Sequence, residues 1–207
     1  MLAVAATATL ALLPRRVSSD CAKVDMTDAV FTAVRDNIIN VEEAVEFAYD
    51  GDIYTKWVDY TGGAASWTTV EIPSATAVRT YGVVSANDAA ERDPANWTLR
   101  ASADGGSTWV VLDSQTGVQF TARHQRRAFD INFEGAAYNA YQLSVTAVAG
   151  GAATELMQVA EFELWSGAEC HDPCCGVDCG DHGACNADTG LCTFVSHSVR
   201  IRGTSSD

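Results

Sequence analysis

The chain has 207 residues, a length that allows one medium domain with a small module beside it, or two small domains. Its formal net charge of −14 argues against a nucleic-acid-binding protein, because a phosphate backbone needs a basic surface. Hydrophobic residues make up 47% and charged residues 19%, so the chain can bury a core and is not a disordered acidic tail.

The N-terminus begins with an apolar run from Leu2 to Leu13. The run is too short to cross a bilayer and suits the hydrophobic part of a secretory signal peptide. It departs from the usual pattern in that no basic residue precedes it, whereas Arg15 and Arg16 follow it. We expect residues 1–19 to be a signal peptide cleaved after Ser19, and the protein to be secreted or to lie on an extracellular surface. An ordinary N-terminal segment is the alternative.

Segments of alternating apolar and polar residues begin at about Thr68 and predict strands. They cover residues 68–72, 78–84, 97–102, 108–112, 127–133, 141–148 and 159–165. The first is expected to stop at Pro73. The sequence Asp-Gly-Gly-Ser at 104–107 predicts a hairpin turn between the third and the fourth. Strands separated by turn signals, without a long helical pattern, predict an all-β protein built as an antiparallel β-sandwich.

Cysteine is concentrated near the C-terminus, where six of the seven lie between Cys170 and Cys192. This density predicts a small disulfide-stapled module made in an oxidising compartment. A zinc site that includes His171 and His182 is the alternative, although the spacing lacks paired Cys-x2-Cys ligands. We therefore expect a sandwich domain at 21–170, a cysteine-rich module at 171–194 and a polar tail at 195–207.

Two segments of the sandwich domain carry a family resemblance, FAYDGDIYTKW at 47–57 and VAEFELW at 159–165. SAND at 85–88 and DPANWTL at 93–99 extend it. The chain resembles the discoidin, or coagulation factor 5/8 type C, domain, a fold shared by carbohydrate-binding modules of the galactose-binding-like superfamily. The resemblance covers most of residues 30–166 and implies a jelly-roll β-sandwich.

The family often carries one structural Ca²⁺ between an early loop and the last strand. The resemblance implies oxygen ligands from the side chains of Asp50, Asp52, Thr55 and Glu161 and from the carbonyls of Phe47 and Ala160. These hard oxygen donors are the type that Ca²⁺ prefers. Gly51 would allow the tight turn that brings the two aspartates together. An ordinary Asp-Gly turn is the alternative. Trp57, Trp97, Trp109 and Trp165 are expected to be core or sheet-face residues.

The resemblance also implies disulfides. The family commonly closes its domain with one, which here would join Cys21 to Cys170. An unpaired Cys21 is the alternative. The second module resembles an EGF-like domain and implies the pairs Cys174–Cys185 and Cys179–Cys192. Phe194 stands where that family has a cysteine, so the module is partial. Cys175 is then left over, and Cys174 and Cys175 can exchange roles.

The function that the resemblance implies is glycan recognition by loops at one end of the sandwich. The expected loops are 59–66, 86–96 and 150–156. Their best-placed side chains for hydrogen bonds and ring contacts with a sugar are Asp59, Tyr60, Asn87, Arg92 and Asp93. Ordinary turn chemistry is the alternative for the asparagine and aspartate residues.

Cell adhesion or matrix assembly through a protein or glycoprotein partner is the second hypothesis, and the acidic domain makes an anionic membrane an unfavourable partner. An enzyme is not expected, because the sequence offers no Ser/His/Asp set, no paired histidines at metal spacing and no phosphate loop. Asn96 begins an Asn-Trp-Thr sequon and is a candidate for N-glycosylation, unless it is merely the turn residue before a strand.

Overall fold

The computed structural model describes residues 21–34, 40–60, 65–132 and 136–167, and the backbones of two short strands near the C-terminus. The main body contains ten strands. They are β1 (Val30–Ala33), β2 (Trp57–Asp59), β3 (Ser66–Thr76), β4 (Thr80–Val84), β5 (Pro94–Ser102), β6 (Val110–Gln115), β7 (Arg126–Asp130), β8 (Tyr138–Val148), β9 (Met157–Val159) and β10 (Glu161–Trp165). The predicted signal peptide at 1–19 and the tail at 195–207 lie outside the described residues.

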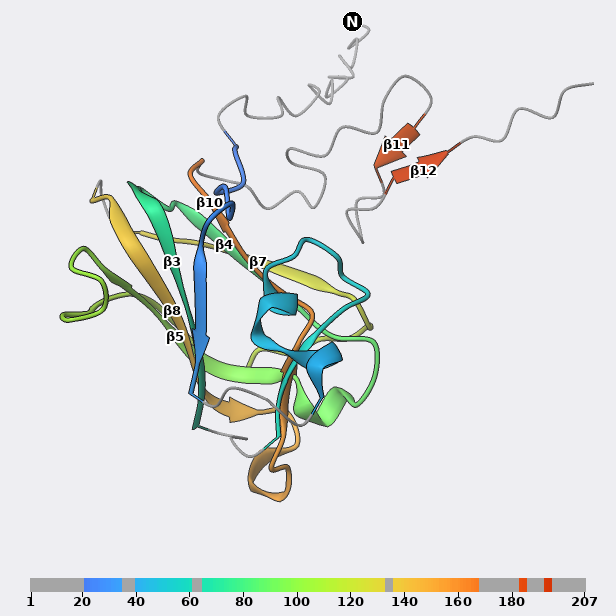
Figure 1. The fold of residues 1–207 in the computed structure, drawn as a ribbon. Helices are drawn as coiled ribbons and strands as arrows, with labels where there is room; N and C mark the ends of the chain where they lie inside the picture. Colours follow the sequence, from blue (N-terminus) through green and yellow to red (C-terminus); the bar gives the residue numbers. More distant parts are fainter. Residues whose placement is uncertain are drawn as a thin grey trace, which may run out of the picture.

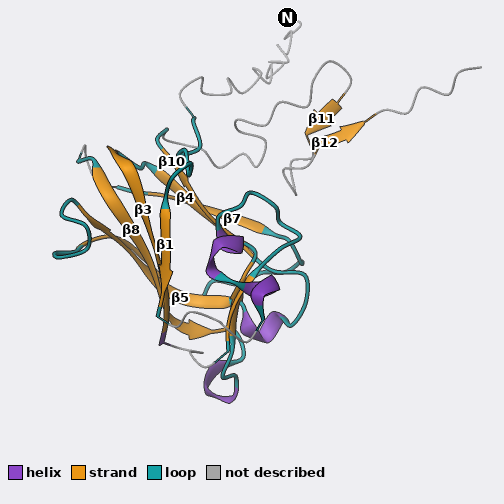
Figure 2. Ribbon diagram, in the orientation of Figure 1, coloured by secondary structure: helices purple, strands orange, loops and turns teal. Residues whose placement is uncertain are grey.

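The strands form a β-sandwich, as predicted. One sheet has the order β1-β3-β8-β5-β6, the other has the order β10-β4-β7, and β2 pairs separately with β9. All of these pairings are antiparallel. The two larger sheets lie on opposite sides of the domain (Figure 1). The short 3-10 helices η1 (Val41–Glu43), η2 (Val45–Ala48), η4 (Ala90–Arg92) and η5 (Gly151–Ala153) gather toward one end (Figure 2).

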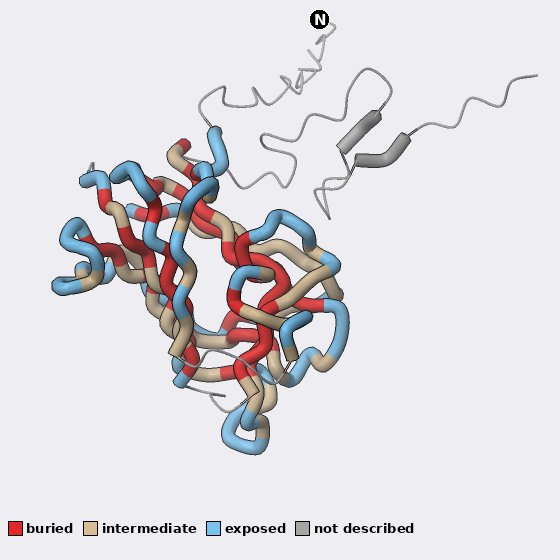
Figure 3. The backbone as a smooth tube through the Cα atoms, viewed as in Figure 1, coloured by how far each residue is buried: buried red, intermediate tan, exposed pale blue. Residues whose placement is uncertain are grey.

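The core fills the space between the two sheets, and buried stretches of the chain lie on both sides of it (Figure 3). Leu99 and Leu143 of the larger sheet and Tyr81 and Phe162 of the smaller one belong to the same buried cluster. Of the expected tryptophans, Trp57, Trp97 and Trp165 are buried, whereas Trp109, in the turn before β6, is half-buried. In this core the Trp97 indole N–H donates to the Tyr81 hydroxyl at 2.9 Å, and Tyr81 in turn donates to Asp113 at 2.6 Å. Burial of these large side chains is the main stabilising contribution to the sandwich.

The hairpin predicted around 104–107 is present as β5 and β6. The Asp104 carboxylate accepts hydrogen bonds from Ser102 and from the Thr108 amide and hydroxyl, which lowers its pKa to about 2. The prediction that the strand from Thr68 stops at Pro73 is wrong, because β3 continues to Thr76. The pairing register with β8 shifts between Glu71 and Thr76, and such an irregularity tolerates a residue without an N–H donor.

Near the C-terminus, β11 (Gly183–Cys185) pairs with β12 (Cys192–Phe194) in antiparallel register, with Cys185 opposite Cys192. The side chains there, and the rest of the predicted EGF-like module, lie outside the described residues. Cys21 is disulfide-bonded. Its predicted partner, Cys170, is also outside the described residues, so that pairing and the other two disulfides remain predictions.

Candidate functional site

The turn from Asp50 to Thr55, which follows η2, is the first part of the site. Gly51 has φ +82°, the left-handed conformation that favours glycine. The Asp50 carboxylate accepts hydrogen bonds from the Asp52 amide at 2.8 Å and from the Thr55 hydroxyl at 2.8 Å. The Asp52 carboxylate accepts from the Tyr54 amide at 2.9 Å instead. The turn therefore forms its own hydrogen-bond network, with Asp50 at its centre.

Glu161, at the start of β10, meets this turn. Its side chain is 1% exposed, and its Oε1 accepts a hydrogen bond from the Gly51 amide at 3.0 Å. Its Oε2 is buried without a hydrogen-bond partner. Burial raises the pKa of Glu161 to about 9; Lys23 opposes the shift, and the nearby Asp50 and Glu163 add to it. The chain thus buries an acceptor oxygen beside a second carboxylate.

The Asp50 turn and Glu161 fit a Ca²⁺ ion because Glu161 Oε2 is buried without a hydrogen-bond partner. Asp50, Thr55 and Glu161 lie together, and a cation beside Glu161 Oε2 would satisfy it. In the described part of the chain no three His, Cys, Asp or Glu side chains are grouped as a metal site. A cation here would therefore need backbone oxygens as well. Among the expected carbonyl donors, Phe47 lies in η2, and buried Ala160 lies between β9 and β10.

The three loops predicted to recognise a ligand lie at one end of the sandwich, which we call the three-loop end. The Gly150 amide donates to the Glu91 carbonyl at 2.7 Å, so the loops at 86–96 and 150–156 are in direct contact. Asp59 pairs with Met157, which brings the 59–66 loop to the start of β9. Residues 61–64 of that loop lie outside the described residues.

Two of the predicted ligand contacts are buried within the three-loop end. Asp59 is 0% exposed and accepts a hydrogen bond from the Ser66 hydroxyl at 2.6 Å. Asp93 is 2% exposed and pairs with both terminal nitrogens of Arg123. Burial is the largest influence on the Asp93 pKa and raises it, although Arg123 opposes the change. Both carboxylates hold the loops in place rather than face solvent.

The other three predicted contacts lie nearer the surface. Asn87 is exposed, and the Arg92 side chain is 31% exposed. Tyr60 donates its hydroxyl to Glu43, and this hydrogen bond is the main reason that the Tyr60 pKa is raised. These side chains supply an amide, a cation and an aromatic ring.

We call Glu43, Lys56, Tyr60, Asp88 and Gln158 the Lys56 cluster. Sequence reasoning identified only Tyr60 of this group and missed the other four residues. Lys56 Nζ lies 2.8 Å from Asp88 Oδ1 and 3.6 Å from Glu43 Oε1. The bond from Lys56 lowers the Asp88 pKa. Gln158, fully buried, donates to the Asp88 carbonyl at 2.6 Å. The buried members thereby hold the exposed Asp88 carboxylate and the partly exposed Tyr60 side chain in fixed positions, as recognition of hydroxyl groups requires.

The loop at 121–125 connects the Asp50 turn with the three-loop end. Arg123 Nη1 donates to the Asp88 carbonyl at 3.0 Å, in addition to pairing with Asp93. The neighbouring His124 lies with Nδ1 2.7 Å from the Ile53 carbonyl, and its ring centroid is 5.1 Å from that of Tyr54. His124 has φ +55°, a conformation unusual for a residue other than glycine. The loop at 121–125 is therefore bound to the three-loop end through Arg123 and to the Asp50 turn through His124.

The Asn96 sequon lies within β5. Its Oδ1 accepts a hydrogen bond from the Gly117 amide at 2.8 Å, and the Thr98 hydroxyl is buried without a hydrogen-bond partner. The sequon is therefore part of a strand, and its glycosylation remains a prediction.

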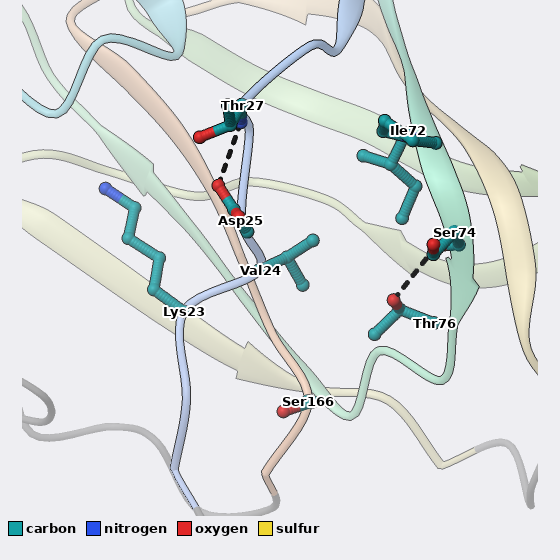
Figure 4. A pocket seen from close by; sticks show the side chains of 9 residues that line it. Lys23, Val24, Asp25, Thr27, Ile72, Ser74, Thr76 and Ser166 are labelled. Atoms are coloured by element: carbon teal, nitrogen blue, oxygen red, sulfur yellow. Dashed lines mark hydrogen bonds between the residues drawn. The ribbon is translucent and has the colours of Figure 1, made fainter.

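A groove of about 260 Å³ lies at the other end of β3 (Figure 4). Val24 and Ile72 face it together with the polar residues Ser74, Thr76 and Ser166. It is smaller than most small-molecule sites. None of the predicted site residues lines it.

No family model matches the chain. It is 35% identical over 120 residues to a peptide-N(4)-(N-acetyl-β-glucosaminyl)asparagine amidase of Arabidopsis thaliana. That match covers 57% of this chain but spans only 17% of the length of the relative. Within the described residues, no helix has the length and apolar character needed to span a membrane.

Solved structures show the fold. An F5/8 type C domain from Bacteroides fragilis has a TM-score of 0.60 at 12% identity, covering 72% of this chain and 99% of its own. A CBM32 module of Clostridium perfringens, in complex with GalNAc-β-1,3-galactose, has a TM-score of 0.58 at 16% identity and covers 69% and 99%. The family 32 module of C. perfringens NanJ, in complex with galactose, has a TM-score of 0.56 at 12% identity and covers 69% and 97%. The chain thus has the same β-sandwich fold as these domains.

Proposed function

We propose that the sandwich domain is a non-catalytic module that binds an oligosaccharide at the three-loop end, outside the cell. The observation that carries the proposal is the Lys56 cluster, in which a lysine, two carboxylates, an amide and a tyrosine are joined by hydrogen bonds and ion pairs. Exposed Asn87 and half-buried Arg92 lie beside it. Such a set offers both donors and acceptors to sugar hydroxyls, and a tyrosine ring can face the C–H side of a sugar. The disulfide at Cys21 supports an oxidising compartment.

The comparisons suggest which glycans to test first. The two carbohydrate-binding modules named above were solved with galactose or with GalNAc-β-1,3-galactose. The Arabidopsis relative is named for the N-acetyl-β-glucosaminyl asparagine linkage. We therefore propose sugar chains of glycoproteins as the ligand class. A protein partner in adhesion or matrix assembly is the alternative outcome.

A Ca²⁺ ion is proposed at the Asp50 turn, with Asp50, Thr55 and Glu161 as side-chain ligands. When bound, it would neutralise the carboxylates and satisfy the unpartnered oxygen of Glu161. Asp52, Phe47 and Ala160 remain proposed ligands from the family resemblance. The loop at 121–125 contacts the turn through His124 and the three-loop end through Arg123. A turn held in place by Ca²⁺ would therefore also stabilise the three-loop end.

The test is a glycan array with the full, oxidised chain, in Ca²⁺ and again in EDTA. Hits are measured by calorimetry for the wild type and for Asn87→Ala and Arg92→Ala. We expect each variant to lose roughly tenfold in affinity, because each loses one hydrogen bond to the sugar. Ser74→Ala, in the groove at the other end, is the control and should bind as the wild type does.

Three results would contradict the proposal. Absence of binding by folded protein would favour a protein partner. Loss of binding in Ser74→Ala alone would move the site to the groove. Release of sugar from an asparagine-linked glycopeptide, detected by mass spectrometry, would show that the domain is catalytic.

A further inference from the structure

The segment at 21–27, which precedes β1, runs beside the end of β10, and we call it the N-terminal strap. The Val24 amide donates to the Leu164 carbonyl at 2.8 Å, and the Ser166 amide donates to the Ala22 carbonyl at 3.0 Å. Lys23 forms an isolated antiparallel bridge with Trp165. The disulfide at Cys21 lies two residues before Lys23. These contacts fix the backbone of the strap.

The direction of the Lys23 side chain follows from this arrangement. Neighbouring residues of an extended chain point to opposite sides, and Figure 4 shows Lys23 and Val24 leaving the strap in opposite directions. Val24 is buried and belongs to the core. Lys23 therefore extends over the outer face of β10, the face that carries Glu161 and Glu163.

The Lys23 ammonium lies among the acidic groups of the proposed metal site. Its Nζ is 3.5 Å from Glu163 Oε1 and 3.9 Å from Glu161 Oε2, the oxygen without a hydrogen-bond partner. A Cβ built on Gly51 would be 3.7 Å from the same nitrogen. Lys23 thus lies at the Asp50 turn although it is far away in the sequence.

Glu163 is neutralised by another residue as well. Its Oε2 accepts a hydrogen bond from Arg126 Nε at 2.6 Å, and the Arg126 guanidinium lies 4.0 Å from the centre of the Trp165 ring. For Glu161, Lys23 is the ion-pair partner among the residues that the structure describes. The Lys23 side chain is 40% exposed, so it can turn toward water while its backbone stays in place.

We propose that the Lys23 ammonium competes with Ca²⁺ for the place beside Glu161, because its Nζ lies 3.9 Å from Oε2, the oxygen that a cation would satisfy. The inference rests on the proposed metal site and adds that Lys23 limits the affinity of this site for Ca²⁺. A calcium ion bound to Glu161 Oε2 would lie close to the Lys23 ammonium, and the two positive charges would repel each other. Metal binding must therefore move the Lys23 side chain away. The strap returns it whenever the metal leaves, because its backbone is fixed.

The test is calorimetric titration of the metal-free full chain with CaCl₂. Lys23→Met should bind Ca²⁺ about fivefold to tenfold more tightly than the wild type, on the order of the effect of one unit charge about 4 Å away in a water-like medium. Lys23→Arg keeps the charge and should stay within about twofold of the wild type. Arg100→Gln, on β5 of the other sheet, removes the same charge elsewhere and is the matched control.

Equal or weaker Ca²⁺ binding by Lys23→Met would overturn the inference, as would an equal gain in Arg100→Gln. If neither the wild type nor Lys23→Met binds Ca²⁺, the metal site fails and the inference fails with it. The glycan array tests the glycan role separately. Absence of glycan binding together with the expected order of Ca²⁺ affinities would contradict only the glycan role.

Discussion

Replacing Glu161 with glutamine should remove a large part of the pH dependence of folding. In the metal-free wild type, burial raises the Glu161 pKa from 4.5 to about 9. The folded protein therefore holds a proton that the unfolded chain releases above pH 4.5, and stability falls as the pH rises between these two values. One proton corresponds to about 1.4 kcal/mol per pH unit, so the loss from pH 6 to pH 8 is about 3 kcal/mol. Glutamine keeps an acceptor for the Gly51 amide but carries no proton that titrates.

The assay is urea unfolding in EDTA, followed by tryptophan fluorescence at several pH values. The difference in slope between the wild type and Glu161→Gln isolates this carboxyl, because all other groups titrate in both proteins. Asp104 and Asp88 have lowered pKa values, so their contributions change in more acidic solution. Equal slopes from pH 6 to pH 8 would refute the reasoning. Addition of Ca²⁺ should flatten the wild-type curve and leave that of Glu161→Gln unchanged.

Three further predictions concern the three-loop end and the core. Arg123→Met should lower the free energy of unfolding in urea by about 3 kcal/mol, because buried Asp93 loses its partner. Asp93→Asn should lower it less, and the reverse order would contradict the role of Arg123 as the partner of a buried charge. Gly150→Ala should lower the free energy of unfolding by about 1–3 kcal/mol in thermal unfolding and weaken glycan binding, because its Cβ would lie 2.9 Å from the Glu91 carbonyl. Unchanged stability and affinity would show that the loops adjust freely. Trp97→Phe should cost about 1 kcal/mol or more in urea unfolding, because the Tyr81 hydroxyl loses its donor, and a neutral result would argue against that hydrogen bond.

The sandwich could be predicted because its central strands alternate and its turns contain glycine. β8 extends the segment expected at 141–148 by three residues, to begin at Tyr138. In the main body, the short strands β1 and β2 escaped prediction. β1 has four residues, of which only Thr32 is polar, and β2 has three and is buried along its whole length. The last predicted strand is divided at Ala160 into β9 and β10, which pair with different partners.

The candidate site was predictable only where the signal is local or strongly patterned. The turn at Asp50 and the carboxylate of Glu161 were both identified from the sequence, and the structure places them in contact. The burial of Asp59 and Asp93 could not be predicted from the sequence. A polar residue next to a loop gives the same sequence pattern whether its side chain faces solvent or packs against another loop. Lys23 was also beyond reach, since 140 positions separate it from Glu163 and only the strap brings them together.

The division of the last strand at Ala160 has a thermodynamic consequence. Gln158 stands beneath Asp88 at the three-loop end, and Glu161, three positions later, stands at the Asp50 turn. One short segment, 158–161, thus belongs to both proposed binding places. If Ca²⁺ increases glycan affinity by some factor, the glycan must increase Ca²⁺ affinity by the same factor. A glycan-rich surface would then load the module with metal at calcium concentrations that leave the free protein partly empty.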